Sequence, residues 1–121
     1  MFLAISIVAS AGETGIASHY STKTNGKQTA SGIPLNDSFF TAAHKCLSFG
    51  TIVKVTNLIN DKVAFVKITD RGPYIKNRII DLSTSTAKFL GFYKEGITKV
   101  KIEVIKKGNN ERIKKHIKHP K

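Results

Sequence analysis

The chain has 121 residues and a formal net charge of +12, from 20 Lys and Arg against eight Asp and Glu. Hydrophobic residues make up 40% of the sequence. That share can build one compact core but not two, so it excludes a multidomain enzyme, and it also excludes a wholly disordered chain. The charge suits three kinds of partner: nucleic acid, an anionic membrane surface, or an acidic polymer such as a cell wall.

The first eleven residues resemble a secretory signal sequence. Residues 2–11 form a mainly apolar run, which is too short to span a bilayer because a spanning helix needs about 20 residues. Ala9 and Ala11 supply the small residues of a cleavage site before Gly12, although only Met1 stands where a basic segment is usual. We expect export of the chain without a lipid anchor, and a buried strand is the alternative for this segment.

Alternation of apolar and polar residues predicts strands in the body of the chain. The expected strands are residues 15–20, 51–56, 63–69, 78–82 and 99–104. The positions that alternation turns inward are Thr51, Val53, Val55, Ala64, Val66, Ile68, Val100, Ile102 and Val104. Turn-forming residues between positions 57 and 62 predict a hairpin between the second and third of these strands.

One helix is expected over residues 84–90, because Ser83 can cap its start and Gly91 stands where helices commonly end. A shorter helical turn is expected at residues 41–44. Several short strands with little helix favour an all-β fold closed into a barrel, which leaves no exposed sheet edge.

The carboxy-terminal end has a different composition from the body. Residues 106–121 hold seven Lys and Arg and one Glu, a net charge of +6 that is half of the total. With few apolar groups to bury, this segment is predicted to be a flexible basic tail. His116 and His119 are three residues apart but have no third ligand nearby, so we expect them to be solvated.

Cys46 is the single cysteine of the chain, which excludes an internal disulfide and a CxxC metal site. Its small and apolar neighbours favour a buried side chain. His44 lies two residues away, and such close neighbours point in different directions, so the pattern does not favour a Cys–His nucleophile.

Three segments place polar residues in an apolar context: residues 29–32 (TASG), 41–45 (TAAHK) and 69–74 (TDRGPY). Asp70 ends a hydrophobic strand before a turn that Gly72 and Pro73 restrict, so its carboxylate is expected at the barrel rim in one orientation. The residues alone leave two alternatives open. Asp70 can be a turn cap, and His44 can be a structural histidine.

Taken together, these segments resemble the rare lipoprotein A (RlpA) family of bacterial envelope proteins. The matching stretches run in order from Gly15 to about Ile105: GIASHYS, GKQTASG, TAAHKCLSFGTIVKVTNLIN, ITDRGPYIKNRIIDLS and LGFYKEGITKVKIEVI. The resemblance implies a six-stranded double-psi β-barrel with one or two short helices over residues 15–105.

The resemblance also implies lytic transglycosylase activity. Such enzymes cleave peptidoglycan between N-acetylmuramic acid and N-acetylglucosamine, here in strands without stem peptides, and leave 1,6-anhydromuramic products. Cell wall remodelling and daughter-cell separation are the implied roles. By position, the family's catalytic aspartate and histidine correspond to Asp70 and His44, whereas its glutamate position holds Ile33. The alternative is therefore a catalytically weak or inactive glycan-binding barrel.

One carboxylic acid can suffice for this reaction, because the sugar's own C6 hydroxyl is the attacking group and no water needs activation. Asp70 can then protonate the leaving oxygen and afterwards deprotonate the hydroxyl. Asp81 is the second candidate carboxylate, and holding its loop is an equal alternative. Arg71 can bind the lactyl carboxylate of peptide-free muramic acid, and Tyr20 and Tyr74 can either stack on sugar faces or pack.

The charge does not indicate nucleic-acid binding, because the basic tail has no aromatic residue to stack on bases. No cofactor or metal is expected, since His44 has no companion ligands in the sequence. We expect a monomer, periplasmic or secreted, that acts on peptidoglycan glycan strands. Its basic residues can hold it near an anionic envelope surface.

Overall fold

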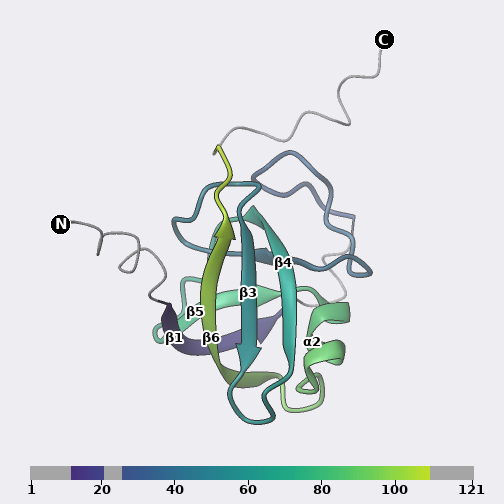
Figure 1. Ribbon diagram of the computed structural model, residues 1–121. Helices are drawn as coiled ribbons and strands as arrows, with labels where there is room; N and C mark the ends of the chain where they lie inside the picture. Colours follow the sequence, from purple (N-terminus) through teal and green to yellow (C-terminus); the bar gives the residue numbers. More distant parts are fainter. Residues whose placement is uncertain (1–11, 21–25, 110–121) are drawn as a thin grey trace, which may run out of the picture.

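The computed structural model describes residues 12–20 and 26–109, and within them the strands form a closed barrel (Figure 1). The strands adjoin in the order β1–β5–β2–β4–β3–β6. Their bounds are Glu13–His19 for β1, Thr41–Ala43 for β2, Ile52–Asn57 for β3, Val63–Asp70 for β4, Arg78–Leu82 for β5 and Ile97–Lys106 for β6. The expected all-β, six-stranded barrel is confirmed, with one short helix in the described part. The expected signal sequence, residues 1–11, lies outside the described residues.

Two parallel pairings bring four strand ends to the same rim. β1 pairs in parallel with β5, and β2 with β4, while β2 and β5 are antiparallel neighbours. Ala43, the last residue of β2, is thereby opposite both Asp70 and Asp81. Ser18, near the end of β1, is also opposite Asp81. Polar residues from three separate strands, β1, β4 and β5, therefore meet at this rim.

The barrel interior follows the alternation expected from the sequence. Val53 and Val55 of β3 and Ala64, Val66 and Ile68 of β4 are each at most 3% exposed. Burial of such β-branched and aliphatic side chains provides most of the stabilisation of a small barrel.

The inward position expected for Val104 is wrong, since this side chain is 44% exposed. The pairing of β3 with β6 shifts register at this point. Val53 is opposite Val104, but Ile52 is opposite Lys106, which leaves one extra residue on β6. Such a bulge bends the strand and turns its end away from the core.

The helix α2 spans Thr84–Leu90, as the sequence predicts. Gly91 ends it in the left-handed conformation with φ 81°, which a residue without a side chain adopts most easily. Ser83 occupies the position before the helix, but its hydroxyl pairs with the Thr86 hydroxyl at 2.7 Å and caps no backbone N–H of the helix.

The helical turn expected at residues 41–44 is wrong, because Thr41–Ala43 is the strand β2. This short segment lies between β4 and β5 and pairs with both. Cross-strand hydrogen bonds on both sides override the local helical preference of its alanines.

The buried position expected for Cys46 is also wrong, since Cys46 is exposed. It lies in the loop after β2, where its backbone N–H donates to His44 Nδ1 at 3.1 Å. The neighbouring Leu47 packs against the core in its place.

The folded part of the chain extends slightly beyond residue 105. Lys106 is still part of β6, and the Gly108 N–H donates to Thr51 Oγ1 at 3.0 Å. A side chain at Gly108 would meet the Phe49 carbonyl oxygen at 2.1 Å, so the close approach requires glycine. Residues 110–121, most of the predicted tail, lie outside the described residues. Within residues 12–20 and 26–109, no helix has the length and apolar character needed to cross a membrane.

Candidate active site

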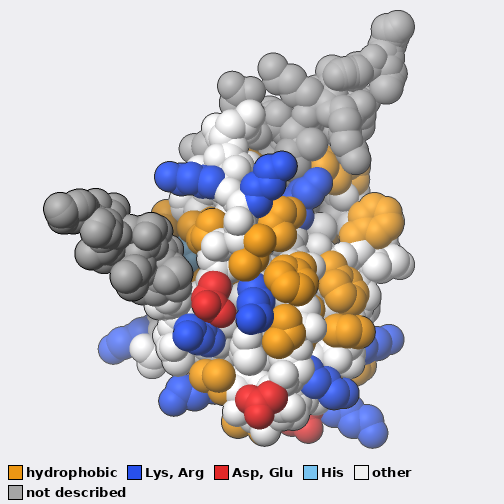
Figure 2. All heavy atoms as spheres, in the orientation of Figure 1, with side chains coloured by type: hydrophobic (Ala, Val, Ile, Leu, Met, Phe, Trp, Pro, Cys, Tyr) orange, Lys and Arg blue, Asp and Glu red, His pale blue; other side chains and the backbone are white. Residues whose placement is uncertain are grey.

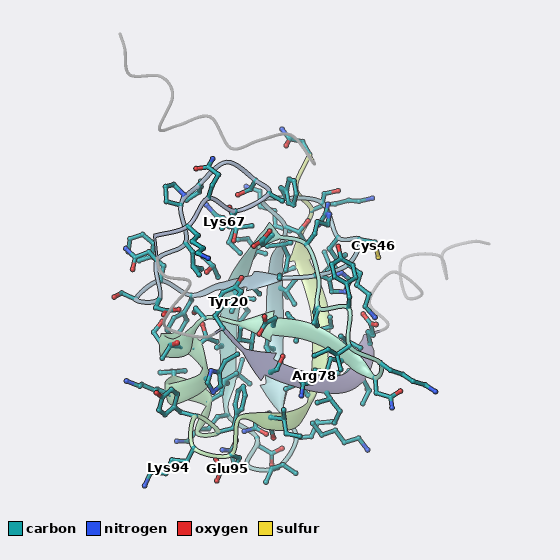
Figure 3. The ribbon with its side chains drawn as sticks, turned by 180° about the vertical axis from the view of Figure 1, so that it is seen from behind. Tyr20, Cys46, Lys67, Arg78, Lys94 and Glu95 are labelled. Atoms are coloured by element: carbon teal, nitrogen blue, oxygen red, sulfur yellow. The ribbon has the colours of Figure 1, made fainter. Side chains whose placement is uncertain are left out.

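A cavity of about 250 Å³ lies at the rim where β1, β2, β4 and β5 end. Its lining residues are Tyr20, Lys27, Gln28, Thr29, Leu35, Ala43, Asp70, Arg71 and Asp81. Figure 3 shows Tyr20 on the side of the barrel where β1 and β5 face the viewer. The cavity brings together four residues singled out in the sequence: Tyr20, Asp70, Arg71 and Asp81.

The Asp70 carboxylate is held by two backbone N–H groups at the end of β4. The Arg71 N–H donates to Oδ1 at 2.9 Å, and the Ala30 N–H donates to the same oxygen at 3.0 Å. The turn-cap alternative is therefore partly realised, because the side chain binds its own turn. Both bonds use Oδ1, which leaves Oδ2 as the oxygen that can reach a substrate.

The TASG segment positions the Ala30 N–H against Asp70. The Thr29 and Ser31 hydroxyls are 2.9 Å apart, and the Ser31 N–H donates to the Thr69 carbonyl at 3.0 Å. Ser31 is fully buried. The segment thus holds Asp70 through a backbone N–H, and its hydroxyl groups maintain the turn. Its polar composition suggested a role at the site but did not predict these contacts.

Asp81 supplies a second carboxyl group to the cavity. The Ser18 hydroxyl donates to its Oδ1 at 3.2 Å. Burial raises the pKa of the Asp81 carboxyl above its usual range. The Ser18 hydrogen bond and the nearby His19 and Arg78 oppose this rise, and the Asp70 charge adds to it. Asp81 therefore keeps its proton to a higher pH than an ordinary aspartate.

Tyr20 forms an apolar part of the cavity wall together with Leu35 and Ala43. Its side chain is 8% exposed. Burial, and then the charges of Asp81 and Asp70, raise the pKa of the Tyr20 phenol far above its ordinary value. The phenol therefore stays protonated and can act as a hydrogen-bond donor throughout the physiological range.

The Arg71 guanidinium binds and stabilises the loop that follows β2. Its Nη1 donates to the Leu47 carbonyl at 2.7 Å and to the His44 carbonyl at 3.2 Å. The guanidinium carbon also lies 4.0 Å from the centroid of the Phe49 ring, a cation–π distance. These contacts tie the arginine next to Asp70 to loop residues 44–49.

His44 is buried beside the cavity rather than in its lining. Its Nδ1 accepts the Cys46 and Leu47 N–H groups, each at 3.1 Å, so the proton of the neutral ring is on Nε2. Nε2 lies 3.2 Å from Glu13 Oε1. Both ring nitrogens therefore have partners within the fold. Glu13 was missed in the sequence because 31 residues separate it from His44.

The candidate Tyr74 and the family's glutamate position, Ile33, lie outside the cavity lining. Tyr74 is 78% exposed in the loop after β4. Ile33 is half-buried in the turn after TASG, where its carbonyl accepts the Thr29 N–H at 3.3 Å. In contrast, Lys27 and Gln28 line the cavity, and nothing in their spacing distinguished them. In the part of the chain that the structure describes, no three His, Cys, Asp or Glu side chains gather to hold a metal ion.

Residues 12–102 match the family described as lytic transglycolase. The chain belongs to this family. It is 46% identical over 99 residues to the endolytic peptidoglycan transglycosylase RlpA of Pasteurella multocida, covering 82% of this chain and 34% of that protein. It is 49% identical over 96 residues to RlpA of Rickettsia felis, covering 77% of this chain and 42% of that protein. The chain thus spans less than half of the length of either relative.

Solved structures show the same barrel as this family member. The expansin of Clavibacter michiganensis matches with a TM-score of 0.62 at 22% identity, over 81% of this chain and 52% of that one. The Streptomyces papain inhibitor matches with a TM-score of 0.64 at 21% identity, over 78% and 94%. At such identities the likeness concerns the fold alone. The resemblance to RlpA and the double-psi barrel expected from the sequence are both confirmed.

Proposed function

We propose that this family member is an endolytic peptidoglycan lytic transglycosylase that cleaves the bond between N-acetylmuramic acid and N-acetylglucosamine. The observation that carries the proposal is the Asp70 carboxylate, fixed through Oδ1 by two N–H groups on the wall of a cavity. Relatives at 44–49% identity bear the corresponding name.

A single carboxyl group can carry both proton transfers of this reaction. In its acid form, Asp70 donates its proton to the glycosidic oxygen as the bond from muramic C1 breaks. The C6 hydroxyl of the same muramic residue then attacks C1, and the Asp70 carboxylate accepts the hydroxyl proton. The products are a 1,6-anhydromuramic end and a free N-acetylglucosamine 4-hydroxyl, and the acid is restored. No water is consumed.

Asp81 and Tyr20 are proposed to hold the sugar rather than to transfer protons. A protonated Asp81 can donate a hydrogen bond to a ring substituent, and the Tyr20 ring can contact the sugar as part of the apolar cavity wall. Asp81 in its charged form instead stabilises the positive charge that develops at C1 in an oxocarbenium-like transition state. Both roles place Asp81 in contact with the substrate across the cavity from Asp70.

Peptide-free muramic acid carries a free lactyl carboxylate, and the cavity offers two cations for it. Arg71 already donates to two loop carbonyls and stacks on Phe49. Lys27 lines the same cavity from an exposed position. We therefore assign carboxylate recognition mainly to Lys27. The preference for strands without stem peptides follows, because a stem peptide would convert this carboxylate to a neutral amide.

His44 is proposed to position the catalytic aspartate. The backbone N–H of His44 donates to the Asp70 carbonyl at 3.1 Å. The Nδ1 atom of its ring accepts the Cys46 and Leu47 N–H groups, which belong to the loop that Arg71 also binds. Tyr74 remains a candidate for stacking on a sugar outside the cavity, because its ring is exposed next to the Asp70 turn.

The remaining proposals concern the setting of the reaction. The chain is proposed to be exported, to act as a monomer in cell wall remodelling and daughter-cell separation, and to prefer glycan over nucleic acid. Its positive charge attracts it to the anionic envelope, an attraction that salt weakens.

The decisive experiment is digestion of purified peptide-free glycan strands, with products identified by mass spectrometry. The parent protein is expected to release anhydromuramic fragments, and Asp70→Asn is expected to release none. Asp61→Asn is the matched control, because Asp61 lies in the exposed β3–β4 turn and tolerates Asn at its positive φ of 64°. Equal product from Asp70→Asn and the parent would contradict the proposal.

A second candidate is a glycan-binding barrel without catalysis, favoured by Ile33 at the position of the family's glutamate. In that case the protein sediments with sacculi but releases no soluble fragment on long incubation. The same digestion therefore separates the two functions.

A further inference from the structure

Phenylalanine side chains gather on the outer surface of the barrel at β4 and α2. Phe39, Phe65 and Phe89 are 59%, 52% and 54% exposed, and Phe40 is half-buried beside them. Figure 2 shows hydrophobic side chains spread over this part of the surface. We call these four residues the aromatic patch. Apolar patches of this kind on a small protein usually mark an interaction surface.

The aromatic patch is assembled from three segments that the fold holds together. The Phe40 and Phe89 rings are 5.4 Å apart between centroids. The Phe40 carbonyl accepts the Lys67 N–H of β4 at 3.1 Å, two residues from Phe65. The helix α2 lies alongside β4 (Figure 1). The patch is therefore a property of the folded barrel and not of one flexible loop.

Lysines surround the aromatic patch. Lys54 of β3 is opposite Phe65, and Lys67 follows on β4. Lys106 ends β6, which pairs with β3. Lys88, which precedes Phe89, lies instead over the Tyr93 ring, 4.9 Å from its centroid. Figure 2 shows Lys and Arg side chains around and between the hydrophobic ones, with few acidic side chains on this face. Exposed aromatic side chains with cations around them complement a surface that has negative charges on its outside and an apolar layer beneath them.

The aromatic patch and the cavity share no residue. Phe65 belongs to β4, which is in front in Figure 1 together with β3 and β6. Tyr20 lies on the reverse side, with β1 and β5 in front (Figure 3). A surface that covered the patch would leave the cavity open to glycan strands.

We infer that the aromatic patch docks the domain on an anionic lipid bilayer. Phe65 and Phe89 enter the headgroup region, and Lys54, Lys67 and Lys106 lie against lipid phosphates. The extended outer surface of strands suits a flat bilayer better than a small ligand. Docking in this orientation directs the cavity away from the lipid.

The chain contains no Trp, so one introduced Trp reports its own surroundings. Phe65→Trp is expected to show a blue-shifted emission and quenching by brominated lipid on vesicles of phosphatidylethanolamine and phosphatidylglycerol. Ile75→Trp is the matched control, because Ile75 is 57% exposed and lies outside the aromatic patch, in the loop that leads to β5. It is expected to show neither change. A Trp at position 65 that is insensitive to vesicles would overturn the inference.

A second pair of variants separates apolar docking from simple charge attraction. Phe65→Ser with Phe89→Ser leaves the charge unchanged, and it is expected to lower vesicle affinity about 10- to 100-fold because two exposed aromatic groups no longer enter the bilayer. Ile75→Ser is expected to bind like the parent. Thermal unfolding confirms that each variant is folded.

Two results would contradict membrane docking. The first is equal vesicle affinity of the double variant and the parent. The second is a parent that ignores vesicles but forms a dimer that the double variant cannot form, which would assign the patch to a second copy of the chain. Neither measurement uses glycan, so the outcome is independent of the proposed catalysis.

Discussion

The backbone N–H of Ala30 donates to Asp70 Oδ1 at 3.0 Å, across 40 residues of sequence. This bond joins the segment after β1 to the end of β4 and fixes the carboxylate in the cavity wall. Because the donor is a backbone group, the identity of the residue at position 30 matters less than the fold of the TASG turn. The buried hydroxyls of Thr29 and Ser31 maintain that turn.

Introducing a carboxylate at position 33, next to this turn, tests whether the family's glutamate position has a catalytic role in this chain. Ile33 is bound to the turn through its backbone, so Ile33→Glu leaves those hydrogen bonds in place. We expect product release from peptide-free glycan to rise, up to the ~10²–10⁴-fold that a general acid–base group commonly supplies. Ile33→Gln has the same shape without the acid and is the control. Equal rates for the two variants would show that the glutamate position has no catalytic role in this chain.

The strands and the catalytic candidate were predictable because their signals are local. Val53 and Val55 alternate with polar residues, and Asp70 directly precedes a restricted turn. The contacts between distant segments were not predictable in this way. Ala43 comes to lie between Asp70 and Asp81 only through a parallel and an antiparallel pairing of β2.

The same limit explains what was missed around the site. Glu13 reaches His44 because β1 begins near the loop after β2, and neither residue's neighbours indicate that contact. Lys27 lines the cavity while the more conspicuous Arg71 is engaged with loop carbonyls. A charged residue next to a catalytic aspartate can thus have a structural task, and only three-dimensional packing separates the two roles.

Lys27→Gln is expected to weaken binding of peptide-free glycan by about 1–2 kcal/mol, because a charge-assisted hydrogen bond to the lactyl carboxylate is lost. The expected effect is a raised KM with little change in kcat. Lys27→Arg is expected to restore the parent KM, and Lys94→Gln, on an exposed turn, is the control for total charge. Chitin oligosaccharides lack the carboxylate, so their affinity should not respond. A Lys27→Gln variant that loses both ligands equally would refute carboxylate recognition.

Arg71→Lys keeps the charge but replaces the planar donor group. A lysine cannot keep the stack on Phe49 together with the two carbonyl hydrogen bonds. We expect a loss of about 1–3 kcal/mol in the free energy of unfolding, measured by urea denaturation, since two loop carbonyls lose their donor. We also expect a lower kcat, because loop residues 44–49 support the Asp70 turn. Unchanged stability would mean that the loop is held without Arg71.

Asp81→Asn is expected to lower glycan cleavage while raising stability at neutral pH. Burial raises the pKa of Asp81 above the ordinary value of 3.8, so the folded chain holds this proton more tightly than the unfolded chain. The resulting stabilisation is present below the ordinary value and is lost as the pH rises through the folded pKa. Asparagine does not titrate and therefore does not lose this stabilisation as the pH rises, whereas the Ser18 hydroxyl can still donate to an asparagine oxygen. The melting temperature of Asp81→Asn should exceed that of the parent at pH 7, and the difference should shrink as the pH falls toward 4.

Asp61→Asn removes a carboxylate from an exposed turn and should show no comparable gain. A melting temperature of Asp81→Asn below that of the parent at pH 7 would show that the charged Asp81 stabilises the fold.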